Sequence, residues 1–150
     1  MTEADALSQL QEFLSFYPDD VQEIAMECRR ILLERVGPAT EIFWDATNAV
    51  CLGFSYTDNV SENFINLAVY PKHVTLIFPN GVKHDDPHRV LRGEGNRVRN
   101  IRLTGPETLS LPSVRDHIMQ AKEIAFRGEE QEFGFIVKVM NGPKKRPSPL

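Results

Sequence analysis

The sequence predicts an α+β domain in which N-terminal and C-terminal helices pack on a mainly antiparallel sheet of about five strands. Apolar residues recur at helical spacing in residues 19–36 and 112–126, whereas short alternating segments separated by turn residues lie between them. The length of 150 residues suits a single domain. We expect this domain to span residues 1–140 and to be followed by a disordered, basic and proline-rich tail at 141–150.

Helical patterns open the chain. Residues 4–16 carry leucine and phenylalanine at spacings of three and four, which predicts a short helix. The stretch PDDVQEIAMECRRILLERVGP has the clearest helical pattern, because its apolar residues form one continuous stripe and Gly37-Pro38 supplies a stop. We therefore expect the helix over residues 19–36 to bury one face against the sheet.

The middle of the chain has the pattern of strands. The expected strands are 40–44, 49–56, 63–70, 73–78 and 97–103, and the segment FGFIVKVM at 133–140 is also strand-like. Strand 49–56 alternates most cleanly, and a short break between 63–70 and 73–78 indicates a hairpin. Whether 133–140 pairs within its own chain is left open by the pattern.

The stretch HDDPHRVLRG has the composition of a metal site, but its local pattern favours a helix of barely two turns. Asp86 would cap this helix, Pro87 would take its first position and Gly93 would end it. His84 and His88 would then face solvent. Because zinc sites normally bring three or four convergent ligands, no metal ligand is assigned in this stretch.

The stretch RGEGNRVRNIRL concentrates arginines and glycines in an otherwise acidic chain. Gly93 and Gly95 follow a predicted helix and precede a strand, which is the reverse of the order in a dinucleotide fold. We therefore interpret both glycines as positive-φ positions in a tight connection. Arg97 and Arg99 share a strand face with large aliphatic residues, so each is either a partly buried ion-pair partner, the favoured alternative, or an anion hook in a cleft.

Composition restricts the class of function. A net charge of −4 argues against a dedicated nucleic-acid binder, although residues 81–103 hold six bases and three acids. No apolar run is long enough to cross a bilayer, so no membrane association is expected. No signal peptide is recognisable and there are two cysteines, Cys28 and Cys51. We expect a cytoplasmic protein with free thiols.

Three segments together resemble a known family. They are LAVYPKHVTLIFPNG, DPHRVLRGEGNRVRNIRL and LPSVRDHIMQAKEIA, and they resemble the YdhG-like domain of unknown function over roughly residues 12–126. Gly93, Gly95 and Arg99 match the most specific part of the family pattern. The resemblance implies a small intracellular α+β domain, and some bacterial members of that family are described as frataxin-like iron chaperones.

Three hypotheses about function remain open. The favoured one is a non-enzymatic domain, without a cofactor, that binds a small anionic ligand or a protein partner. Arg97 and Arg99 would supply charge, and Trp44 would supply an aromatic wall unless it is a core residue. An enzyme is less favoured, because no GxSxG, HExxH or cysteine–histidine motif occurs and no catalytic residue is assigned.

The remaining hypothesis, implied by the family resemblance, is iron handling by an acidic helix. The carboxylates concerned are Asp19, Asp20, Glu23, Glu27 and Glu34. Hard cations prefer oxygen ligands, but carboxylates spread along an exposed helix lack the convergence of a tight site. We expect them to bind Fe²⁺ no better than about millimolar.

Overall fold

The computed structural model describes residues 1–129 and 132–147. The helices are α1 (Glu3–Leu14), α2 (Asp19–Val36) and α3 (Pro112–Ile124). The strands are β1 (Thr40–Asp45), β2 (Val50–Ser55), β3 (Ile65–Val69), β4 (Val74–Phe78), β5 (Arg99–Leu103) and β6 (Phe135–Val139). Three short 3₁₀ turns are η1 (Val60–Glu62), η2 (Gly81–Lys83) and η3 (Pro106–Ser110). None of the described helices is both long and apolar enough to cross a bilayer.

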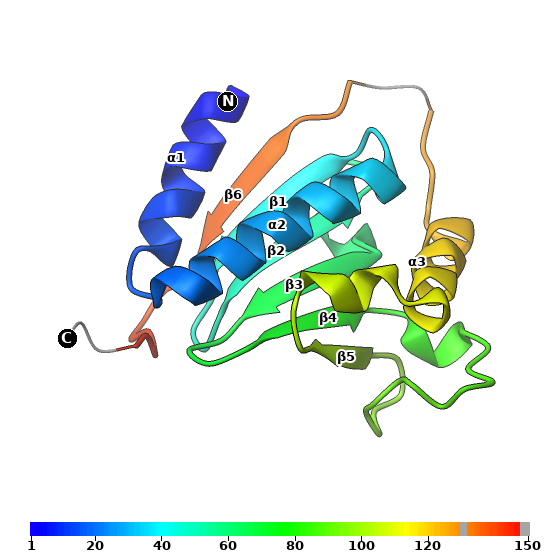
Figure 1. Ribbon diagram of the computed structural model, residues 1–150. Coiled ribbons are helices and arrows are strands. Elements are labelled where there is room, and N and C mark those ends of the chain that lie inside the picture. The colour runs from blue at the N-terminus through cyan, green and yellow to red at the C-terminus, as the bar shows by residue number, and fades with distance from the viewer. Residues whose placement is uncertain (130–131, 148–150) are drawn as a thin grey trace.

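The strands form one six-stranded mixed sheet in the order β5-β4-β3-β2-β1-β6 (Figure 1). Strands β1 to β5 pair antiparallel with their chain neighbours, whereas β6 runs parallel to β1. The predicted α+β class is confirmed, and the estimate of about five antiparallel strands is roughly right. The sheet differs from the prediction in β6, which makes a parallel pair. This strand runs parallel to β1 because the chain returns from α3 to the end of the sheet at which β1 begins (Figure 1).

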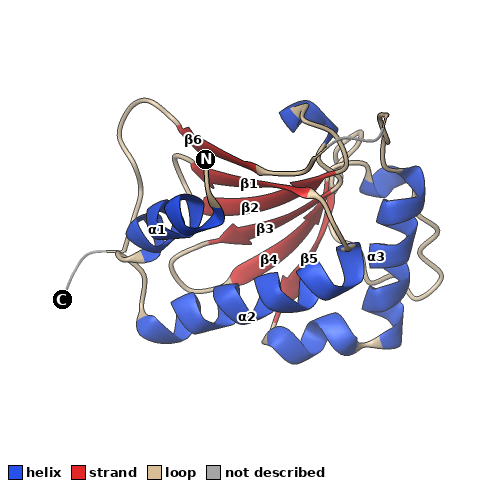
Figure 2. Ribbon diagram, turned by 90° about the horizontal axis from the view of Figure 1, so that it is seen from above, coloured by secondary structure: helices blue, strands red, loops and turns tan. Residues whose placement is uncertain are grey.

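The helices α1 and α2 lie on one side of this sheet, and α3 lies beside the ends of the strands, where it contacts α2 and η3 (Figure 2). Alternation along the strands directs one set of side chains towards the helices, and these make the core. The largest fully buried members from β1 to β4 are Phe43, Leu52, Phe54, Ile65, Leu67, Leu76 and Phe78. The buried stripe of α2 packs on this face, as its helical spacing predicts.

The two cysteines are free thiols, as expected from the sequence. Cys28 is fully buried on the apolar stripe of α2, and Cys51 is partly buried on β2. Burial raises the pKa of Cys28 to about 12 and the pKa of Cys51 to about 11. Both therefore stay protonated at neutral pH and act as small apolar side chains.

The C-terminal segment lies against the turn between β1 and β2. Arg146 forms an ion pair with Asp45 and donates to the carbonyl of Ala46 at 2.6 Å. The backbone N–H of Lys145 donates to the carbonyl of Thr47 at 2.7 Å. The tail predicted as disordered at 141–150 thus makes defined contacts in its described part, and residues 148–150 lie outside the described residues.

A buried ion pair joins α2 to the sheet. Arg29 donates through Nε and Nη2 to the two carboxylate oxygens of Glu41, at 2.8 and 2.9 Å. The side chains are 10% and 5% exposed, and the Arg29 guanidinium lies 5.8 Å from the ring centre of Phe43. Both carboxylate oxygens of Glu41 therefore have a donor, which is the condition for tolerating a buried charge.

We expect the fold to lose stability when one member of this pair is removed, and to keep most of its stability when both members are replaced by apolar residues. Arg29→Met or Glu41→Leu alone should lower the free energy of unfolding by about 3–5 kcal/mol, because each leaves an unpaired buried charge. The double variant should recover most of this loss, since two apolar side chains carry no desolvation cost. Urea unfolding of the four proteins measures the coupling. Additive losses in the double variant would contradict this account.

Candidate functional site

The stretch HDDPHRVLRG does not form the predicted helix. Residues 84–98 run as a loop that bridges back to β5 through Arg92 and Asn100. The Asp86 side chain accepts hydrogen bonds from the backbone N–H groups of Val90 and Leu91, further along the chain than a helix cap would reach. These bonds hold an open turn, so the helix prediction for this stretch is wrong.

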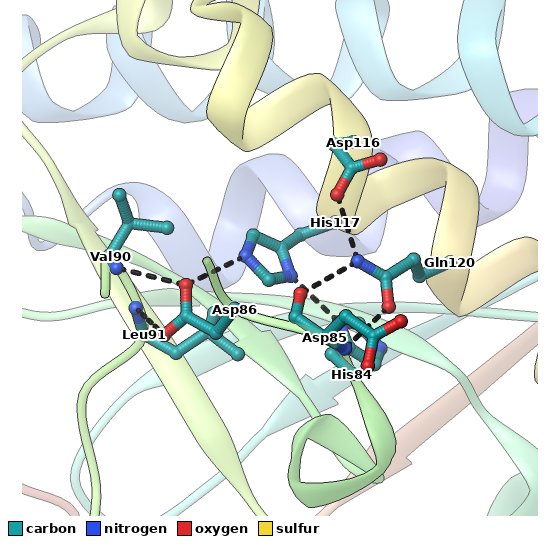
Figure 3. A network of polar contacts seen from close by, with 8 residues as sticks. All are labelled: His84, Asp85, Asp86, Val90, Leu91, Asp116, His117 and Gln120. Atoms are coloured by element: carbon teal, nitrogen blue, oxygen red, sulfur yellow. Dashed lines mark hydrogen bonds and ion pairs between the residues drawn. The ribbon is translucent and has the colours of Figure 1, made fainter. Parts of the chain in front are cut away.

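His84 is not solvent-facing as predicted, but meets His117 of α3 (Figure 3). The two Nδ1 atoms are 3.0 Å apart, and the ring planes are within 10° of each other. The ring centres are 5.3 Å apart with the Nδ1 contact between them, so the rings meet edge to edge rather than face to face. His117 is 2% exposed, and Phe78 packs against both rings.

A third group fixes the direction of the hydrogen bonds. Nε2 of His117 lies 3.2 Å from Oδ1 of Asp86 (Figure 3). An ionised carboxylate only accepts, so His117 donates through Nε2, and in the neutral ring its Nδ1 is left as an acceptor. His84 then donates through its own Nδ1. In this tautomer the hydrogen bonds run one way, from His84 to His117 to Asp86.

The pKa shifts agree with this assignment. The pKa of His84 is lowered to about 4, mainly by burial and then by the neighbouring His117, against smaller opposing effects of Asp116 and Asp86. Burial alone would raise the pKa of Asp86, but the N–H groups of Val90 and Leu91, with His117, outweigh it and leave that pKa lowered. At neutral pH the carboxyl is ionised and His84 is neutral.

Gln120 ties the loop to α3 and so sets the distance between the histidines (Figure 3). Its Oε1 accepts from the backbone N–H of Asp85 at 2.7 Å, and its Nε2 donates to the carbonyl of Asp85 at 2.9 Å. The same amide donates to Asp116 at 2.8 Å. Because Gln120 follows His117 by three residues, one face of α3 holds both the loop backbone and the ring.

A cavity of about 380 Å³ lies beside His84. It is bounded by η1, η2, the loop before β5 and the C-terminal end of α3, whereas His117 does not line it. The ring atom that His84 has left for a partner is Nε2, since Nδ1 is engaged with His117. Among the described residues Nε2 has no hydrogen-bond partner, and it is not one of the buried unpartnered atoms.

The cavity combines exposed apolar side chains with two cations. Val82, Ile124 and Phe126 are 47%, 41% and 65% exposed and line it. Lys83 and Arg97 line it as well, and both are exposed. Amide side chains contribute Asn80 and Asn96, and the carboxylate of Glu62 accepts from Thr57 at 2.9 Å.

The structure places the predicted candidate Arg97 in this cavity. Its guanidinium makes a 3.3 Å contact with the amide oxygen of Asn80. The predicted ion pair with an acid of the helices is not formed in the part of the chain that the structure describes, so most donors of Arg97 face the cavity or solvent.

Arg99 instead serves the loop that precedes β5. Its guanidinium donates to the carbonyls of Gly95 and Val98 at 2.7 and 2.8 Å. A Cβ on Gly81 would lie 2.5 Å from the Arg99 Cβ, so a glycine is needed there for the two segments to approach. Gly93 has a φ of +123°, as predicted, but Gly95 has no positive φ, so that half of the prediction is wrong.

Trp44 is not brought to these arginines. It lies on the side of β1 that faces away from the helices, half-buried, with its ring against Gly53. Strand β1 is four strand spacings from β5, about 19 Å. A wall shared by Trp44 and Arg97 is therefore wrong, and packing on Gly53 accounts for the position of the tryptophan.

The acidic helix proposed for iron is partly engaged in ion pairs. Arg30 contacts Glu27 at 2.5 Å and Glu34 at 2.6 Å, so two of the five carboxylates have a cationic partner. Among the described residues, no group of three or more His, Cys, Asp or Glu side chains is arranged to hold a metal ion. Weak iron binding by this helix remains a prediction.

Sequence reasoning missed the histidine pair, because 33 residues separate its members and no local motif joins them. One signal was present in α3. His117 stands three residues after Val114 and four before Ala121, which places an imidazole on the apolar stripe of that helix. A buried histidine on such a stripe needs a polar partner, which His84 and Asp86 supply.

Comparison of the chain with protein-family models finds no matching model, and comparisons with curated proteins and with solved structures find no match either. The resemblance to the YdhG-like domain therefore stays a prediction. Function has to be argued from the geometry of the site itself.

We expect His84 to make stability depend on pH. The unfolded chain binds a proton at His84 below pH 6.5, whereas the folded chain binds it only near pH 4. Its contribution to stability is complete above 6.5 and is lost as the pH falls towards 4. Thermal melts of His84→Asn should show a shallower acid dependence than wild type in this window. His88→Asn, at an exposed histidine, is the control, and parallel slopes in all three proteins would refute the assignment.

Arg99 should behave as a structural residue. Arg99→Ala removes two bonds to loop carbonyls and the stem that packs on Gly81, so we expect a loss of about 1–3 kcal/mol in the free energy of unfolding. Arg102→Ala, at an exposed position on the opposite face of β5, should have little effect. An Arg99→Ala protein with an unchanged melting temperature would show that this side chain is kept for a ligand instead.

Proposed function

We propose that this protein is a non-enzymatic binding domain for a small organic anion, held in the cavity beside His84. The observation that carries the proposal is the meeting of two cations that have no ion-pair partner among the described residues, Lys83 and Arg97, with the exposed apolar side chains Val82, Ile124 and Phe126 around one hollow. Exposed apolar groups that gather at a concave surface are typical of a binding site.

The charges favour an anionic group at one end of the ligand. Among the described residues of the lining, Lys83 and Arg97 outnumber the carboxylate of Glu62, and His84 is neutral at neutral pH. The guanidinium of Arg97 keeps donors free for a carboxylate or phosphate, because its contact with Asn80 at 3.3 Å uses only one of them.

The apolar side chains favour a hydrocarbon or aromatic portion at the other end. Phe126 is 65% exposed, and covering its ring would remove an apolar area from water that the fold leaves uncovered. A volume of about 380 Å³ is in the range of small-molecule sites and is too small for a folded partner. These properties support a small amphiphilic anion as the ligand in preference to a protein.

Phenyl phosphate and phenol are suitable probes, since they share a ring and differ in charge. In a titration followed by backbone amide NMR, phenyl phosphate should shift the signals of η2 and of the end of α3, and phenol should bind far more weakly. Arg97→Glu should weaken phenyl phosphate binding at least about tenfold, since it removes one charge-assisted bond and adds a repulsion.

Arg102→Glu is the matched control, because it makes the same charge change on the same strand region but outside the cavity. It should leave binding nearly unchanged once salt is present at physiological strength. Equal losses in the two variants would mean that only the general field of the basic region attracts the anion. Absence of any shift with phenyl phosphate, and also with the aromatic carboxylates mandelate and phenylacetate, would refute the proposed function.

A further inference from the structure

His84 lines the cavity, and the ring nitrogen that it has left for a partner is an acceptor. Asp86 fixes the protonated nitrogen of His117 as Nε2, which makes Nδ1 of His117 accept from His84. The proton of neutral His84 is therefore on Nδ1, and Nε2 carries a lone pair without a partner among the described residues. The cations of the same cavity, Lys83 and Arg97, only donate.

An anion in this cavity therefore meets two kinds of neighbour. Its oxygens can accept from Lys83 and Arg97, but an oxygen without a proton placed against Nε2 of His84 would set two lone pairs against each other. A ligand that carries an O–H beside its negative charge satisfies both. We infer, on the basis of the proposed function, that the cavity selects anions that bear their own O–H donor and that His84 accepts that hydrogen bond.

Two chemical sources supply this combination. A phosphate monoester retains one O–H in its monoanion, and its second pKa is about 6. A 2-hydroxycarboxylate carries its hydroxyl next to the carboxylate. The shared feature is an O–H donor within one or two bonds of the charged group, and matched pairs of ligands separate the two sources.

The tautomer of His84 is held against changes of the surroundings. Asp86 receives three donors, from Val90, Leu91 and His117, so its carboxylate is satisfied only in the ionised form. Of the described residues, Asp86 from the loop and Asp116 from α3 act on His84 as negative charges. Gln120 donates to Asp116 and so holds that carboxylate on the helix. The Nδ1 contact of His84 with His117 leaves Nε2 as the acceptor.

The experiment uses two pairs of ligands that differ only in the donor. Phenyl phosphate is compared with phenyl sulfate, which has the same ring and a similar tetrahedral anion but no proton near neutral pH. Mandelate is compared with phenylacetate, which lacks the hydroxyl. Dissociation constants are measured by NMR titration of the full chain near pH 6, where about half of the phosphate monoester is the monoanion.

We expect at least one donor-bearing ligand to bind about tenfold or more tightly than its partner, because the partner leaves the nitrogen of His84 unsatisfied. The pair that shows the preference identifies the source of the O–H. If phosphate is the source, phenyl phosphate should weaken as the pH rises above about 6, whereas phenyl sulfate should not change. The ¹⁵N signal of His84 Nε2 should move with the preferred ligand alone.

His84→Asn tests the assignment to this nitrogen. Asparagine can keep an N–H donor towards His117 but has no atom at the position of Nε2. In this variant the preference should fall to near unity while binding that depends on Arg97 persists, and His88→Asn should retain the preference. A preference that survives in His84→Asn overturns the inference.

The remaining outcomes separate the inference from the proposed function. Equal affinities within both pairs, with binding still lost in Arg97→Glu, would overturn the role of His84 and leave the anion site standing. Failure of all four ligands to bind would overturn both. The wild-type comparison alone decides the first case, so the test holds even if His84→Asn does not fold.

Discussion

Burial of one face of the sheet is the constraint on which the rest of the structure depends. The helices α1 and α2 cover that face and α3 closes its edge at the ends of the strands, so the buried positions are favoured to be apolar or paired (Figure 2). Glu41 occupies such a position, and Arg29 meets it with two hydrogen bonds. His117 is the comparable case on α3, and it too has a partner at each ring nitrogen. These two polar side chains are tolerated in the layer because each is hydrogen-bonded, and the second leads directly to the candidate site.

Asp86 organises that site through the number of donors it receives. Two backbone N–H groups fold the loop around its carboxylate, and His117 supplies the third donor. A carboxylate in this position shapes the loop and also sets the tautomer of both imidazoles. The hydrogen bonds of Asp86 thus determine both the conformation of the loop and the tautomer of the histidine that lines the cavity. A loop of this kind needs no regular secondary structure to be well defined, because side chains satisfy its backbone groups.

Helices and strands with an extended apolar pattern were predicted correctly from the sequence. Segments whose structure depends on contacts with residues far away in the chain were not. Helix α2 and strands β1 to β4 follow from apolar spacing within single segments. The segment 84–93 has residues that are suited to begin and end a helix. Its contacts with α3, more than 30 residues away in the sequence, outweigh that local preference. The His84–His117 contact and the pairing of β6 with β1 were not predicted for the same reason, since each joins residues that are far apart in the sequence. Arg97 was predicted as a candidate from a local pattern of cationic and apolar side chains, and it lines the cavity. The position of Trp44 depends instead on the strand that its side chain packs against.

The distribution of charge is compatible with the proposed anion site in an acidic chain. Residues 1–45 carry ten acids and three bases, and most of them lie on α1 and α2, whereas residues 81–103 carry six bases and three acids around η2 and β5. A small anion is attracted to the second region, and its approach over the helices is disfavoured. A nucleic acid needs many phosphate contacts along an extended surface, and it would meet the acidic helices before it gained them. Lys83 and Arg97 instead converge on one concave volume. Convergence of two cations suits a single charged group, so the same arrangement that favours a small ligand argues against a polyanion.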